Sequence, residues 1–153
     1  MGPVLHIALI NPEIGPNTGN IGRLCLGIGA RLHLVHPLGF DTGDKAVRRA
    51  GLDYWKHVDV AEHEDGDAFW QWARGRRVHL LSTKANKSYA EPDWQGGDVL
   101  VFGPESRGLD ETLFNEFPVF RIPMTGPIRS LNLSNAVAVV AYAALRRINP
   151  ELF

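Results

Sequence analysis

The sequence lacks the features that mark several large classes of protein. Its 153 residues contain one cysteine, so no disulfide can form within the chain, and a reducing compartment such as the cytoplasm is expected. No apolar run is long enough to span a membrane, and the first residues do not have the layout of a signal peptide. The formal net charge is only −1, which argues against a protein that coats nucleic acid but allows local basic patches.

Common signatures of phosphate and metal binding are also missing. The glycine-rich stretch NPEIGPNTGNIGR at 11–23 has no Lys-Ser/Thr after its glycines, and it does not fit the GxGxxG pattern of dinucleotide-binding proteins. The six histidines and the cysteine show no zinc-ligand spacing, so no metal is expected. The chain also has no linker, repeat or low-complexity run, which predicts a single domain over 1–153.

Apolar runs of strand length alternate with segments of helical periodicity. Ile21, Leu24, Cys25 and Ile28, for example, recur at the spacing of one helix face. Such alternation predicts an α/β domain, Rossmann-like, with a mainly parallel sheet flanked by helices. Strands are expected at 4–10, 31–37, 77–84, 98–105 and 119–124, and helices at 18–30, 43–55, 65–75, 109–117 and 132–148.

Ligands of parallel sheets usually bind beyond the carboxyl ends of the strands, and an unusual segment follows the first predicted strand. Asn17 or Thr18 is expected to cap the helix there. Arg23 lies one turn into that helix, off its apolar stripe, with Asn20 one turn earlier on the same side. A helix arginine is most often simply solvated, but at a strand end it can meet an anionic or hydroxyl group of a substrate.

Two more strand ends carry polar residues. In VLVFGPESRGL (99–109), Gly103 would let a ligand approach the backbone, although Glu105 and Arg107 could equally form a surface ion pair in a turn. In RIPMTGPIRSLNLSNAVAVVAY (121–142), a polar loop precedes a helix that is apolar on nearly every side. A second copy of the chain is the expected cover for that helix.

Together, in this order, these segments resemble the SPOUT superfamily of RNA methyltransferases. The closest resemblance is to the short subfamily that 2'-O-methylates the wobble nucleotide of certain tRNAs. It covers essentially the whole chain and is carried by PEIGPNTGNIGRLC, PLGF, DKAVRRAGLDYW, STK, FGPESRGL, RIPM and RSLNLSNAVAVVAY. The chain departs from the pattern in TGPI before Arg129 and in the variable region 85–97.

The resemblance implies a fold and a reaction. The fold would contain a deep trefoil knot in the C-terminal half, although protein chains generally avoid knots. The reaction would transfer a methyl group from S-adenosylmethionine to the 2'-hydroxyl of nucleotide 34, a cytidine or modified uridine in the anticodon loop of tRNA. The enzyme would be a homodimer and would need no metal.

The resemblance also implies roles for individual residues. Arg23 and Arg129 would face the ribose or a phosphate. Since a guanidinium stays protonated near neutral pH, stabilisation of the developing alkoxide is the favoured role, and action as a base stays open. Asn20, Glu105 and Asn132 would orient these groups or link the two subunits. Cofactor contacts are implied for Leu81, Thr83, Gly103, Ile122, Met124, Ser130, Leu131 and Asn132.

Contacts with RNA and rival functions remain open at this point. Candidate phosphate contacts are Arg48 with Arg49, the group Arg74, Arg76 and Arg77, and Lys84 with Lys87. Rival readings are a nicotinamide-dependent oxidoreductase, a non-catalytic RNA-binding dimer, and a methyltransferase that acts on a base or on another ribose.

Overall fold

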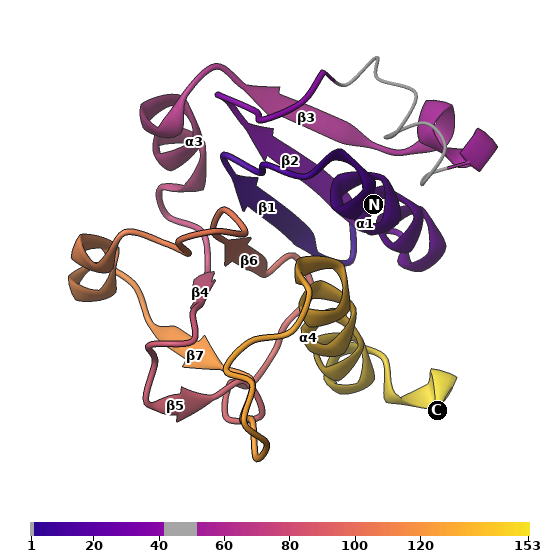
Figure 1. Ribbon diagram of the computed structural model, residues 1–153. Coiled ribbons are helices and arrows are strands. Elements are labelled where there is room, and N and C mark those ends of the chain that lie inside the picture. Colours follow the sequence, from indigo (N-terminus) through magenta and orange to yellow (C-terminus); the bar gives the residue numbers. More distant parts are fainter. Residues whose placement is uncertain (1, 42–51) are drawn as a thin grey trace.

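The computed structural model describes residues 2–41 and 52–153, and its centre is one sheet of seven strands (Figure 1). The strand order is β3-β2-β1-β6-β4-β7-β5, and every neighbouring pair is parallel. The strands are β1 (His6–Ile10), β2 (Arg31–Val35), β3 (Val60–His63), β4 (Val78–Leu81), β5 (Lys87–Ser88), β6 (Val99–Phe102) and β7 (Val119–Arg121).

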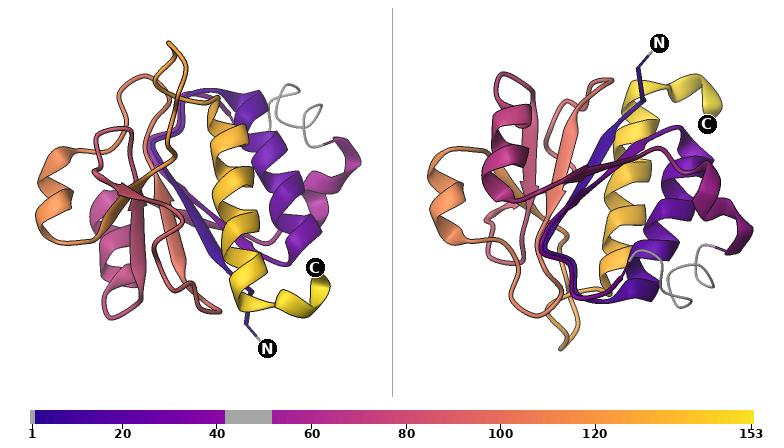
Figure 2. Two further views of the ribbon diagram at one scale, coloured as in Figure 1. Left: turned by 90° about the horizontal axis from the view of Figure 1, so that it is seen from below. Right: turned by 90° about the horizontal axis from the view of Figure 1, so that it is seen from above.

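Helices cover both faces of the sheet. Figure 2 shows α1 and α4 side by side on one face, with α3 and the short helix η2 on the other. The helices are α1 (Gly15–Ile28), α3 (Gly66–Ala73) and α4 (Leu133–Ile148), with 3-10 turns η1 (Leu52–His57), η2 (Glu111–Asn115) and η3 (Pro150–Leu152). No helix within the described residues has the length and apolarity that a membrane crossing requires.

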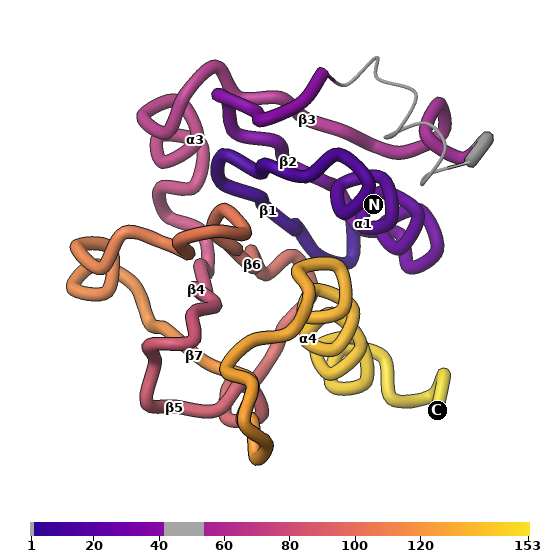
Figure 3. The backbone as a smooth tube through the Cα atoms, viewed as in Figure 1, coloured from indigo at the N-terminus to yellow at the C-terminus, as the bar shows by residue number. Residues whose placement is uncertain are grey.

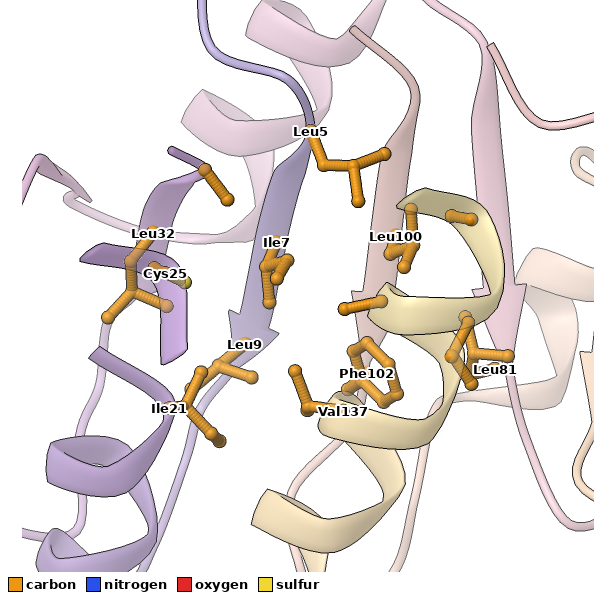
Figure 4. Close-up of a cluster of buried hydrophobic side chains, with 14 of the residues drawn as sticks. Leu5, Ile7, Leu9, Ile21, Cys25, Leu32, Leu81, Leu100, Phe102 and Val137 are labelled. Atoms are coloured by element: carbon orange, nitrogen blue, oxygen red, sulfur yellow. The ribbon is translucent and has the colours of Figure 1, made fainter. Parts of the chain in front are cut away.

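The larger core lies between the sheet and the α1–α4 layer (Figure 4). Ile7 of β1 and Leu100 of β6 point from the sheet, while Cys25 of α1 and Val137 of α4 meet them, and all four are fully buried. Burial removes the thiolate of Cys25 from water and raises the pKa of this thiol to about 12. The cysteine is therefore an inert core residue.

The structure confirms the α/β class and the parallel sheet, and it corrects several elements. All five predicted strands exist but are shorter, and β3 and β5 were not predicted. The helix predicted at 109–117 is only the 3-10 turn η2. Asp110 caps the start of this turn, and the chain leaves the turn at Glu116 to enter β7. Most of the helix predicted at 43–55 lies outside the described residues, and its end forms η1.

Candidate functional site

A cavity of about 480 Å³ opens at the carboxyl ends of β4, β6 and β7. Its walls come from the segments 81–84, 102–109 and 120–136, together with Ile14 and Asn17 at the start of α1. All eight residues for which cofactor contacts were predicted line it: Leu81, Thr83, Gly103, Ile122, Met124, Ser130, Leu131 and Asn132. Their convergence is a fact of the geometry, and their role in binding remains a prediction.

The loop after β1 is held by a carboxylate from the loop after β6. Glu105 Oε1 accepts a hydrogen bond from Glu13 N at 2.8 Å, and Oε2 accepts one from Ile14 N at 3.0 Å. The carboxylate therefore lies at the positive end of α1, where a negative charge is favourable. The prediction that Asn17 or Thr18 caps this helix is wrong, because α1 begins earlier and both residues are buried in its first turns.

The same two loops are joined in the opposite direction. Glu13 Oε1 accepts from Ser106 N at 2.8 Å, and Oε2 accepts from Ser106 Oγ at 3.0 Å. These hydrogen bonds, helped by the nearby charge of Arg107, lower the pKa of the Glu13 carboxyl below its usual value. Each loop thus contributes a carboxylate that binds the other loop, and we call these reciprocal contacts of Glu13 and Glu105 the carboxylate clasp.

Asn17 connects the clasp to the loop before α4. Its Nδ2 donates to Glu105 Oε2 at 3.2 Å, and its Oδ1 accepts from Asn132 Nδ2 at 3.1 Å. Asn132 caps α4, because its Oδ1 accepts from Ser134 N at 2.9 Å. Figure 3 shows how the chain returns from β7 to begin α4 beside α1. Hydrogen bonds therefore join three loops that are far apart in the sequence.

Gly103 lies where two backbone segments meet. A Cβ at this position would lie 2.3 Å from Gly108 C and 2.4 Å from Leu109 N. The loop turns back on itself here, with Gly108 N donating to Pro104 O at 2.9 Å. A residue with a side chain would not fit here, so the folded loop itself requires glycine. The approach of a ligand to Gly103, which also lines the cavity, stays a prediction.

The candidate catalytic residues fall into two groups. Glu105 and Arg129 line the cavity, and Arg129 is exposed. Asn20 and Arg23 are exposed on α1 and do not line it. The guanidinium of Arg23 lies 5.2 Å from the centre of the Tyr54 ring, a cation–π geometry. Within one chain, Arg23 is therefore not brought to the cavity.

The loop 123–131 contributes Met124, Arg129, Ser130 and Leu131 to the cavity wall. Within the described residues, none of its N–H or C=O groups bonds to another main-chain group. Backbone groups of this kind bond to water or to a ligand. The apolar side chains of Leu81, Ile122 and Leu131 lie beside them. An apolar pocket edged by backbone donors and acceptors suits a flat heteroaromatic group joined to a polar chain.

Basic groups are distributed unevenly around the molecule. Arg76 and Arg77 lie just before β4, at the end of the strand opposite the cavity. Arg76 stacks over Trp72 at 4.2 Å, and Arg77 Nε pairs with Asp98 at 2.7 Å. Lys84, in contrast, lines the cavity. Arg48 and Arg49 lie outside the described residues. In residues 2–41 and 52–153, no group of three or more His, Cys, Asp or Glu could hold a metal ion.

Three residues that build the site were missed by sequence reasoning. No role was predicted for Glu13 or Ser106, and only a capping role was predicted for Asn17, yet the three make hydrogen bonds that join the loops. Their partners lie about ninety residues away in the sequence. The carboxylate of Glu13 beside the prolines of the first motif was the available signal, because an isolated acid in such a loop needs donors.

Comparison with known proteins identifies a family. The sequence pattern described as the SpoU rRNA Methylase family matches residues 4–142. The tRNA (cytidine(34)-2'-O)-methyltransferase of Escherichia coli K12 is 47% identical over 148 residues, which covers 95% of this chain and 94% of that protein.

Solved structures agree with this match. A structure described as "Structural insights into the 2-OH methylation of C/U34 on tRNA" has a TM-score of 0.91 and 47% identity, and the alignment covers 95% of this chain and 96% of that one. An AdoMet-bound rRNA methyltransferase from Sinorhizobium meliloti has a TM-score of 0.86 and 25% identity, over 95% of this chain and 58% of that one.

Proposed function

Because the chain belongs to the SpoU rRNA methylase family, we propose that it methylates the 2'-hydroxyl of nucleotide 34, the wobble nucleotide of tRNA. Cytidine and modified uridine are the proposed bases, and the cytoplasm is the proposed location. The similar proteins named for this activity align over nearly their whole length with this chain. The observation that carries the proposal is the convergence of the eight predicted cofactor residues on one cavity.

S-adenosylmethionine is the proposed cofactor, and it would supply a methyl group on a sulfonium sulfur. An S. meliloti relative is described with this compound bound. In this chain, Leu81, Ile122 and Leu131 would enclose the adenine, and the main chain at Met124 and at 129–131 would bind its edge and the polar tail. Glu105 and Asn132 would keep the cavity in shape through the hydrogen bonds that join the loops.

Arg129 has the position for an electrostatic role. It lines the cavity and is exposed, so it can reach an RNA phosphate or the ribose oxygen as negative charge develops there. We keep it as the first candidate for the catalytic group supplied by the same chain. Replacing it with alanine should reduce methyl transfer far more than binding of S-adenosylhomocysteine, which titration calorimetry measures.

We also propose that two copies of the chain form the active enzyme. Exposed apolar side chains lie on the two helices that form the outer layer: Ile14 is 46% and Leu26 37% exposed beside or in α1, and Val139 is 37% and Tyr142 47% exposed in α4. A second copy packed on this layer would cover them. It would also bring Arg23 and Asn20 of one chain toward the cavity of the other.

Mixed dimers test this arrangement. Arg23→Ala and Arg129→Ala should each be inactive alone. Unfolded and refolded together, they should regain about a quarter of wild-type activity, because half of the dimers would be mixed and each would hold one intact site. Inactivity of the mixture, with mixed dimers present, would contradict the supply of Arg23 by the second copy.

The deep trefoil knot belongs to the same proposal. It is supported by the path of the chain, which pairs β7 with β4 and then returns past β6 to place Asn132 beside Asn17. Stretching the chain between its ends by optical tweezers tests it. A knotted chain, when fully unfolded, should be shorter than its contour length, and the full contour length would contradict the knot.

The activity itself is tested with tRNA transcripts and a labelled methyl donor. The expected product is tRNA with one 2'-O-methyl group at nucleotide 34, located by nucleoside mass spectrometry after nuclease digestion. A transcript that already carries this methyl group is the control. A methyl group on a base, or at another ribose, would contradict the proposed position.

A further inference from the structure

A second cavity, of about 550 Å³, lies on the other side of the loop 104–109. Its walls come from the end of β1, from α3, from the residues after β4 and from η2. It shares five lining residues with the first cavity: Lys84, Pro104, Arg107, Gly108 and Leu109. We call these five residues the partition, because they form a wall common to both cavities.

The partition is fixed from two sides. Ser106, inside the loop, donates two hydrogen bonds to Glu13. The backbone at Gly108 and Leu109 rests directly on Gly103. A wall held in this way has little freedom to move, so both cavities exist before a ligand arrives, which lowers the entropy cost of binding.

Positive charge is placed on the partition. Arg107 is exposed, and its charge is one cause of the lowered pKa of Glu13. Lys84 Nζ lies 3.6 Å from Glu111 Oε2, and these side chains are 56% and 65% exposed. An ion pair this long and this exposed contributes little stability, so Lys84 can exchange Glu111 for a phosphate.

The rest of the second cavity suits a nucleoside. Trp70 is half-buried and stacks on Phe117, with ring centres 5.0 Å apart, so it forms an apolar wall. Asn11 Nδ2 donates to Val35 O at 3.2 Å and to Pro37 O at 3.3 Å. These bonds fix the amide and leave its oxygen as the group that can accept a hydrogen bond from a base or a ribose.

We propose that the second cavity binds the nucleotide next to the one that is methylated, with the connecting phosphate between Lys84 and Arg107. The inference rests on the proposed function, which puts the target ribose at the first cavity. Successive nucleotides of a single-stranded loop are joined by one phosphate and can be turned apart into separate pockets. Two cavities divided by a wall that carries two cations match that geometry.

The test uses an anticodon stem-loop RNA in three forms: the natural RNA, one with a neutral methylphosphonate at the linkage 5' of nucleotide 34, and one with it at the linkage 3' of nucleotide 34. Dissociation constants are measured with S-adenosylhomocysteine present, and methyl transfer is measured separately. In wild type, one of the two neutral linkages should weaken binding about fivefold, whereas in K84A/R107A it should have no effect, since the partners of the phosphate are gone. An equal loss of RNA affinity in both proteins would overturn the proposal that the second cavity binds a nucleotide.

The substitution Glu111→Gln is expected to increase the affinity of the protein for RNA. It removes the carboxylate that competes for Lys84, so RNA should bind about threefold more tightly. Glu116→Gln is the matched control, because Glu116 is exposed, ends the same helix η2 and lines neither cavity. An unchanged affinity in Glu111→Gln, or the same gain in both variants, would count against the proposal.

The design separates this inference from the function on which it rests. If wild type binds RNA with the expected linkage effect but transfers no methyl group, the proposed function is wrong, and the second cavity is still an RNA site. If wild type methylates nucleotide 34 and neither neutral linkage distinguishes it from K84A/R107A, the inference alone is wrong.

Discussion

Two polar clusters join neighbouring segments of this fold. One is built from carboxylates and the other from imidazoles. The carboxylate clasp of Glu13 and Glu105 lies at the carboxyl edge of the sheet, between loops. The second cluster lies on the sheet itself, where His6 Nδ1 is 2.9 Å from His33 Nε2 and His33 Nδ1 is 2.9 Å from His63 Nε2. We call these three side chains the histidine ladder, since they connect β1, β2 and β3.

Their surroundings explain the difference. The ladder is enclosed, with His6 and His33 only 5% and 1% exposed and the Trp72 ring centred 4.2 Å from that of His33. Burial lowers the pKa of His6 to about 4 and that of His33 to about 3, so the ladder is neutral at pH 7. Glu13 also has a lowered pKa, but hydrogen-bond donors cause it and the group stays charged. The clasp therefore keeps its charge at the cavity edge, whereas the buried ladder is neutral.

The largest expected effect comes from Gly103→Ala, which disturbs the clasp and leaves the ladder untouched. The new Cβ would lie 2.3 Å from Gly108 C, and backbone cannot move aside as a flexible side chain can. The free energy of unfolding should fall by about 3 kcal/mol, measured by urea denaturation, with binding of S-adenosylhomocysteine lost. Gly27→Ala is the control, since a Cβ at Gly27 meets nothing within 4 Å. Wild-type stability in Gly103→Ala would show that the loop can move.

Glu105→Ala should separate activity from stability. The alanine leaves Glu13 N and Ile14 N to water, so the unfolding free energy should fall by only about 1 kcal/mol. The loops after β1 and β6 would no longer be held in their relative positions. The value of kcat/KM for tRNA should therefore fall about 100-fold, equivalent to about 2.7 kcal/mol. Glu116→Ala should change neither quantity. Methyl transfer within a few-fold of wild type in Glu105→Ala would contradict a role for the clasp in shaping the site.

The ladder should make the stability of the protein depend on pH in a higher range than the clasp does, because the lowered pKa of Glu13 places its contribution below the usual carboxyl range. His6 binds a proton near pH 6.5 when unfolded but only near pH 4 when folded, so acid favours the unfolded chain. The stability is complete above pH 6.5 and is lost as the pH falls toward 4, by on the order of 3 kcal/mol from His6. Urea denaturation between pH 7 and pH 5, above the range in which carboxyl groups titrate, measures the start of this loss.

Matched variants identify the ladder as the cause. His33→Gln should lower stability at pH 7 and flatten its dependence on pH, whereas His57→Gln, at an exposed position, should leave the pH profile unchanged. A profile for wild type that stays level from pH 7 to pH 5 would show that the imidazoles accept protons without cost.

The smallest effect is expected at the edge of the ladder. Arg76→Ala removes the guanidinium that stacks over Trp72, which should lower the unfolding free energy by about 0.5–1 kcal/mol and leave methyl transfer unchanged. Arg74→Ala, at an exposed neighbouring position, should have no effect on stability. Weaker tRNA binding by either variant, without a loss of stability, would instead assign this group of arginines to RNA.

The sequence was most informative where function depends on motifs in a fixed order. The alternation of apolar runs and helices predicted the parallel sheet, and the eight cofactor residues that the family resemblance selected all line one cavity. β3 was missed because VAEH is only partly buried at the sheet edge, and β5 because two residues carry no periodicity. These strands exist through pairing with distant neighbours, which local patterns do not encode.

The contacts that hold the loops of the site together were less predictable than the residues that line its cavity. A helix start normally takes its cap from the adjacent residues, yet α1 meets a carboxylate from Glu105, 91 residues along the chain. The reason for Gly103 was also hidden, because the contact with Gly108 and Leu109 depends on the shape of a folded loop. Arg23 was correctly assigned to α1, but one chain does not carry it to the cavity.

The strand order has a consequence for how the protein folds while it is being synthesised. β4 is made before both of its neighbours, β6 and β7, and the cavity also needs the start of α4, which emerges later still. During synthesis on the ribosome, a nascent chain could assemble β1 and β2 early but would have no complete pocket until its last helix appeared. Capture on immobilised S-adenosylhomocysteine would therefore select finished molecules from truncated ones.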